Sequence, residues 1–287
     1  MMLNRGAMIA LKNFVLVLSA SILLACSEND APKLEEPVQN STTTDDHSQL
    51  SDAPLNNTKA QTEFANKAFL DTLTALDALS LAVTQFTDTP NEQLFNATQA
   101  RLTQAHNAYR VSSAFLALSP AHEASKFLDS YPLLPGYLDS VEGYPNSGII
   151  HSEIPLNVST LEDEFQFSDS MYLTLGFEAF AFILNGDPDS PVAPWRRFND
   201  EGTDKNKHTA ERRRQYLSLL SEHLVSEFKK QKLQFEQLGI LNLHLLQDDA
   251  FKQAYLEAEA ARFDQSLVQK ISEQWAAVEQ LKTEEAL

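Results

Sequence analysis

The stretch LGFEAFAFILNG, residues 175–186, has apolar side chains around the whole circumference of a helix and one charged residue, Glu178. A helix that is apolar nearly all round belongs in a protein core. Gly186 suits the position just after the C-terminus of such a helix. We therefore predict a buried helix here, in which the carboxylate of Glu178 requires either a partner or access to water.

The rest of the chain repeats the helical spacing. Two possible capping boxes, TPNE at 89–92 and STLE at 159–162, would each begin a helix, and the second would begin the helix that contains Glu178. Residues 120–158 are rich in proline and glycine, so we expect only short helical turns there. We predict an all-α fold with long antiparallel helices in one or two packed bundles. The apolar residues that recur every three or four positions lie in the segments 69–86, 102–116, 217–238 and 251–278.

The N-terminal segment has the layout of a lipoprotein signal peptide. Residues 1–25 contain basic residues followed by an apolar run, and LLAC at 23–26 matches a bacterial lipobox that ends at Cys26. We expect cleavage before Cys26, lipidation of its thiol and anchoring in a membrane, more readily the outer than the inner one because Ser27 is not an aspartate. Residues 26–58 have no apolar period and are predicted to be a flexible tether, followed by a helical domain over 59–284.

Composition excludes some partners. The chain carries 40 acidic against 22 basic residues, for a net charge of -18. Such a surface does not suit a nucleic acid, which requires a basic patch. The chain has a single cysteine, so an internal disulfide is excluded. We predict a periplasmic location for the domain and no nucleic-acid partner.

Four segments in order resemble the imelysin-like family. This resemblance implies a bacterial exported helical protein, some members of which are lipoproteins. Members occur in iron-uptake contexts and are also classified as peptidases, so components of iron or metal uptake are the partners that the resemblance implies. The segments are ARLTQAHNAYRVSSAFLALSP at 100–120, LDSYPLLPGYLDS at 128–140, NSGII at 146–150 and ERRRQYLSLLSEHL at 211–224.

The family's hallmark is G-x-H-x-x-E, whose histidine and glutamate lie on one face of a helix and can bind one cation, such as zinc or iron. Gly176 matches the glycine, Glu178 occupies the histidine position and Ala181 occupies the glutamate position. Ser113 occupies the family's acidic position in the second helix. A divalent metal or iron is therefore the cofactor that the resemblance implies, but Glu178 is the one candidate ligand left, and we assign no catalytic residue.

Two hypotheses explain Glu178. In the first, it forms a buried ion pair with Arg212 or Arg213 of the segment ERRRQYL. In the second, it lines the former metal cleft and faces water or a cationic ligand. The two hypotheses differ in what removal of the carboxylate would do to stability.

Three functional hypotheses follow. The first is a lipid-anchored, non-catalytic binding or accessory protein linked to iron or metal uptake. The second is a metallopeptidase with a rearranged metal site. The third is a structural partner protein that has kept the fold and lost the site, because a fold by itself does not determine a function.

Overall fold

The computed structural model describes residues 53–199, 208–260, 269, 272–273 and 275–276. Within these residues it contains six α-helices, several short 3₁₀ turns and no β-strand, which confirms the all-α prediction. The predicted signal segment 1–25 and the lipidation residue Cys26 lie outside the described residues, as does most of the predicted tether.

The helices follow the order of the predicted segments. The first begins at Ala53, inside the segment that we expected to be tether. The α-helices are α1 (Ala53–Asp88), α2 (Glu92–Leu116), α3 (Val158–Glu164), α4 (Gly176–Asn185), α5 (His208–Gln234) and α6 (Asp249–Ala260). The shorter turns are η1 (Pro120–Phe127), η2 (Pro135–Tyr137), η3 (Ile149–His151), η4 (Pro194–Phe198), a π-helical turn η5 (Phe235–Gly239) and η6 (Ile240–Gln247).

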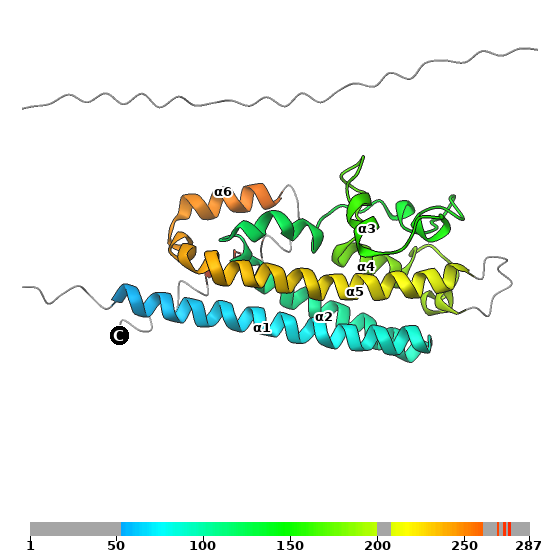
Figure 1. Ribbon diagram of the computed structural model, residues 1–287, viewed down its shortest axis with the longest axis horizontal. Helices are drawn as coiled ribbons and strands as arrows, with labels where there is room; N and C mark the ends of the chain where they lie inside the picture. Colours follow the sequence, from blue (N-terminus) through cyan, green and yellow to red (C-terminus); the bar gives the residue numbers. More distant parts are fainter. Residues whose placement is uncertain (1–52, 200–207, 261–268, 270–271, 274, 277–287) are drawn as a thin grey trace, which may run out of the picture. The chain divides into compact units, whose positions relative to one another are not determined.

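The three long helices share one core. Figure 1 shows α1 and α5 running side by side, with α2 also packed along α1. The ring of Phe69 in α1 lies 5.7 Å from that of Phe228 in α5, and Tyr109 in α2 lies 6.1 Å from the same phenylalanine. All three rings are fully buried. The apolar stripes read from the sequence therefore face one another, which is the packing expected of amphipathic helices.

The prediction of one long helix containing Glu178 is wrong. Two helices, α3 and α4, take its place, and a segment without helical structure at 165–175 separates them. Within that segment the side chain of Asp169 accepts a hydrogen bond from the backbone N–H of Met171, and such short-range bonds compete with a helix. Asn157, not Ser159, caps α3 by accepting a bond from the N–H of Thr160.

Glycine is required where α4 begins. Gly176 has φ +92°, and a Cβ there would lie 2.7 Å from the carbonyl oxygen of Leu128. The next residue, Phe177, donates its N–H to the same oxygen at 2.8 Å. The backbone at Gly176 can approach the carbonyl of Leu128 this closely only because glycine has no Cβ, and this contact fixes the start of α4. Gly186 ends the helix with φ +73°, which confirms its predicted role.

Within residues 53–199 and 208–260 and the few described positions beyond, no helix combines the length and apolar character needed to cross a bilayer.

Candidate functional site

A cleft of about 490 Å³ lies between α2 and α4. The two helices run in opposite directions along it. Gln99 of α2 donates to the side-chain oxygen of Asn185 at one end, over 2.9 Å, and His106 stacks on Phe177 at the other, with ring centroids 4.4 Å apart. The cleft-lining residues are Asn96, Gln99, Ala100, Leu102, Thr103, His106, Asn107, Arg110, Phe177, Glu178, Ala181 and Asn185.

One end of the cleft carries its ionisable groups. Arg110 follows His106 by one helical turn on α2, and Glu178 follows Phe177 on α4, so the three polar side chains lie at the same end. His106 Nε2 is 2.9 Å from a carboxylate oxygen of Asp129, a buried residue. The stacking on Phe177 and the bond to Asp129 hold the imidazole in one orientation.

The middle of the cleft is hollow because small side chains line it. Ala100 and Ala181 face the space from the two helices, and Thr103 lies one turn along α2 from Gln99. A glutamate at position 181, as in the family's hallmark, would extend into this volume. Alanine at position 181 in place of glutamate therefore both lacks a metal-ligand atom and leaves the cleft open.

Only some of the residues predicted from the sequence line the cleft. Glu178 is half-buried and lines the cleft together with Ala181. Ser113 is buried and donates its hydroxyl to the carbonyl oxygen of Arg110 at 2.9 Å, and it is not among the cleft-lining residues. Gly176 acts through the backbone, at the start of α4. Glu178 thus lies in the cleft lining, and its exposure to water or to a cationic ligand stays a prediction.

The arginines that we expected to pair with Glu178 have other partners, which corrects that hypothesis. Arg212 donates to the carbonyl oxygens of Ile149, Ile150 and Ile154 at 2.8–3.0 Å. Arg213 donates to a different acid, described below. Glu178 lines a cleft with α2, whereas these arginines hold a loop against the start of α5, so helical periodicity could not identify the neighbour.

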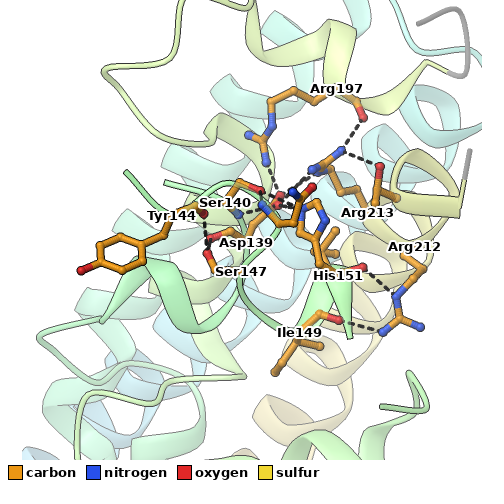
Figure 2. Close-up of polar contacts among 12 residues, drawn as sticks. Asp139, Ser140, Tyr144, Ser147, Ile149, His151, Arg197, Arg212 and Arg213 are labelled. Atoms are coloured by element: carbon orange, nitrogen blue, oxygen red, sulfur yellow. Dashed lines mark hydrogen bonds and ion pairs between the residues drawn. The ribbon is translucent and has the colours of Figure 1, made fainter. Parts of the chain in front are cut away.

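A buried ion cluster centres on Asp139, which has no solvent-exposed surface. Figure 2 shows Arg213 and Arg197 converging on its carboxylate. Arg213 binds both oxygens, with distances of 2.6 and 2.9 Å, and Arg197 Nη2 lies 2.5 Å from one of them. His151 Nε2 lies 3.2 Å from the other oxygen. The cluster joins the loop after η2 to η4 and to α5.

Sequence analysis missed this cluster. Asp139 lies in one of the family-like segments and Arg197 in a loop, and neither belongs to a periodic helix that would indicate its neighbours. Burial alone would raise the pKa of Asp139. The hydrogen bonds from Arg213 and His151, with the positive charges of Arg213 and Arg197, outweigh burial and hold that pKa well below its ordinary value.

The cluster does not have the geometry of a serine hydrolase triad. Ser140 Oγ is 2.7 Å from His151 Nε2, and the carboxylate of Asp139 approaches the same nitrogen. A triad needs the serine and the aspartate on opposite ring nitrogens, so that the aspartate fixes the tautomer in which the other nitrogen accepts the serine proton. The arrangement therefore links parts of the structure and does not form a catalytic triad.

The cleft does not fit a resident metal ion. Among the residues that the structure describes, no three histidine, cysteine, aspartate or glutamate side chains form a group that could hold one. Ala181 of α4 offers no ligand atom, and Arg110 of α2 adds a positively charged side chain to the cleft lining. The cleft is lined instead by amide, hydroxyl and ionisable side chains, a lining that suits a polar molecule.

Comparison with known proteins agrees with the four segments noted in the sequence. No individually curated protein matches the chain. A family profile described as imelysin matches residues 65–286. This match covers well over half of the chain and includes α2, α4 and α5, the helices that build the cleft and the ion cluster. The chain belongs to the imelysin family of peptidases and related proteins.

Proposed function

We propose that this protein is a non-catalytic binding protein, held by a lipid on the periplasmic side of a membrane and accessory to iron or metal uptake. The supporting observation is that Glu178 and Ala181 line an open polar cleft where the family's metal ligands would stand. A volume of about 490 Å³ is typical of small-molecule sites. Protein ligands surround a zinc ion at about 2 Å and need far less room.

The metallopeptidase alternative has less support. It needs a metal to polarise a carbonyl and to activate water, and the cleft residues do not fit that ion. The link to iron or metal uptake rests on family membership, and the binding role rests on the cleft itself.

Filling the cleft tests the binding role. We expect Ala181→Leu to abolish ligand binding, because the added side chain occupies the hollow between the two helices. The measurement is thermal melting of the domain with a panel of polar metabolites, ferric citrate and zinc. A ligand at a hundred times its Kd stabilises a protein by about 2.7 kcal/mol.

The matched control is Ala97→Leu, which makes the same substitution at an exposed position of α2 outside the cleft. We expect at least one compound to raise the melting temperature of the wild type and of this control, but not of Ala181→Leu. The binding role fails if no compound does so, or if the shift survives in Ala181→Leu.

The lipid anchor is tested separately at Cys26. We expect the mature protein to partition into the detergent phase, because a multiply acylated N-terminus gives stable membrane attachment. Cys26→Ser should accumulate as an uncleaved precursor. Mass spectrometry of the N-terminal peptide gives the readout, and an unmodified thiol on protein in the periplasmic extract would exclude the anchor.

A further inference from the structure

We propose that the outer face of the helical turns at the end of α5 lies on the surface of the membrane that holds the protein. This leucine face consists of Leu233, Leu238 and Leu241, which are 53%, 46% and 72% exposed. The inference rests on the lipid anchor of the proposed function and adds a second contact with the same membrane. That contact is non-covalent, and apolar side chains make it.

The three leucines belong to one continuous helical path. α5 passes into the π-helical turn η5 and then into the 3₁₀ turn η6, and the backbone stays in the right-handed helical region at Gln234, Gly239 and Ile240. Residues four positions apart on such a path share a side, so Leu233 and Leu241, two such steps apart, face the same way. Leu238 lies between them along the path and next to the same stripe.

The opposite side of this path is packed in the core. Phe235 and Gly239 are buried, and the ring of Phe235 lies 4.9 Å from that of Phe69 in α1. Leu243 and Leu246 of η6 are buried as well. An amphipathic helix normally places polar residues on its outer side. Three exposed leucines on neighbouring turns therefore add nothing to the core and indicate contact with another apolar surface.

The leucine face lies at the end of the bundle where α1 begins. Figure 1 shows α5 antiparallel to α1, so the last turns of α5 lie beside the first half of α1. The contact between Phe235 and Phe69 agrees with this arrangement, and η6 also packs against α1. The leucine face is therefore close to the point at which the chain enters the helical domain at Ala53.

A lipid at Cys26 would hold this end of the bundle near a bilayer. The predicted tether between Cys26 and Ala53 would span about 30 Å on average if it is flexible. α1 has 36 residues and is about 54 Å long, so its far end lies well beyond the average reach of such a tether. Of the exposed leucines, those at the end of α5 are thus better placed to meet lipid than Leu81, which lies in the far half of α1.

The charges around the leucine face permit a contact with lipid. Glu236 lies between the leucines and forms an ion pair with Lys232, and Lys230 pairs with Glu227 at 3.1 Å. From Glu227 to the end of η6 the chain has three lysines against two glutamates, whereas its overall net charge is -18. Lys229 is exposed beside the leucines, and lysine stems lie along apolar surface while their amino groups reach lipid phosphates.

Contact at this end would leave the cleft between α2 and α4 accessible from the periplasm. Phe95, the residue before the cleft-lining Asn96, lies 6.0 Å from Phe86 near the far end of α1. The leucine face lies beside the first half of α1 instead. The membrane contact and the binding cleft therefore occupy different ends of the bundle.

The experiment uses the full acylated protein in vesicles of phosphatidylethanolamine and phosphatidylglycerol. Cys26 is the sole cysteine and would carry the lipid, so Leu241→Cys offers a single thiol to a nitroxide spin label. Collisions of the nitroxide with oxygen, which concentrates in lipid, and with a nickel chelate, which stays in water, report its surroundings. We expect the label at position 241 to collide more often with oxygen and less often with nickel than a label in water does.

Leu81→Cys is the matched control, because Leu81 is 60% exposed and lies away from the leucine face. Its label should show the collision rates of a site in water. Adding Leu233→Glu and Leu238→Glu to Leu241→Cys should lower the lipid-contacting population of the label about tenfold or more, because the transfer of one leucine out of lipid already corresponds to about that factor. Adding Leu81→Glu to Leu241→Cys should leave that population unchanged.

The outcomes separate this inference from the proposed function. Rates typical of water at position 241 on an acylated protein refute the membrane contact and leave the anchor standing. A label at 241 that is shielded from both reagents also refutes it, because protein then covers the leucine face. Lipid contact that persists in the glutamate variants refutes the role of the leucines. If mass spectrometry finds no lipid on Cys26, the anchor and this inference fail together, and the binding role of the cleft is unaffected.

Discussion

Asp139→Asn is expected to lower the free energy of unfolding by about 3–5 kcal/mol, because it leaves two buried guanidinium groups without their counter-charge. Arg213 and Arg197 both contact this carboxylate, and Asp139 itself is fully buried. Asparagine keeps the size of the side chain and offers one acceptor in place of two. The loss therefore reports the charge and the missing acceptor, and not a cavity.

Urea denaturation at pH 7 measures this loss. The matched control is Asp163→Asn, an exposed residue of α3, which should change stability by less than about 0.5 kcal/mol. A loss for Asp139→Asn of under about 1 kcal/mol would mean that water solvates the two arginines in the variant. The ion cluster would then contribute little to stability.

A second substitution tests the coupling inside the cluster. Removing Arg197 as well, with Arg197→Gln, should cost less in the Asp139→Asn background than in the wild type. The low pKa of Asp139 also fixes the pH range of its contribution. Because its folded pKa lies below its ordinary value of 3.8, the contribution is complete above that value and declines only at lower pH.

The long helices were predictable because periodicity determines them. Phe69, Val83 and Phe86 in α1 and Leu220 in α5 recur at helical spacing, and all are buried. The break between α3 and α4 was not predictable in the same way. It depends on Asp169 capturing a backbone N–H and on Gly176 approaching the carbonyl of Leu128, and neither contact has a periodic signature.

The sequence predicted which residues lie at the candidate site, but it did not predict which residues they contact. The motif positions Glu178 and Ala181 both line the cleft. Pairing with Arg213 failed because a helix period gives the face of a residue and not the element opposite. The partner of Arg213 is Asp139, which lies in a proline-rich loop, where the spacing of residues does not indicate which way a side chain points.

His223 on α5 is the second residue with a large expected effect. It is 3% exposed, and neither ring nitrogen has a hydrogen-bond partner. Its Nε2 lies 3.8 Å from Glu162 of α3, which is beyond hydrogen-bond range. Phe127 of η1 approaches its ring edge-on, with centroids 6.4 Å apart. The pocket therefore favours a neutral imidazole.

Burial and the positive charge of Lys230 lower the pKa of His223 from 6.5 to about 4, although the negative charge of Glu227 acts in the opposite direction. Below pH 6.5 the unfolded chain then binds a proton that the folded one does not. The stabilising contribution is complete above pH 6.5, falls as the pH drops from 6.5 to about 4 and is absent below that. This shift corresponds to about 3 kcal/mol.

We expect His223→Leu to remove this pH dependence, because leucine fills the site and does not titrate. Between pH 7 and pH 4, the wild type should lose about 3 kcal/mol more of its unfolding free energy than the variant. Urea denaturation across that range gives the measurement, and carboxylates that titrate in both proteins cancel in the comparison. His208→Leu, at an exposed position of α5, is the control and should follow the wild-type profile.

Parallel profiles for the wild type and His223→Leu would show that His223 titrates normally in the folded protein, and hence that water reaches its ring. The range also separates this residue from Asp139, whose contribution declines only below pH 3.8.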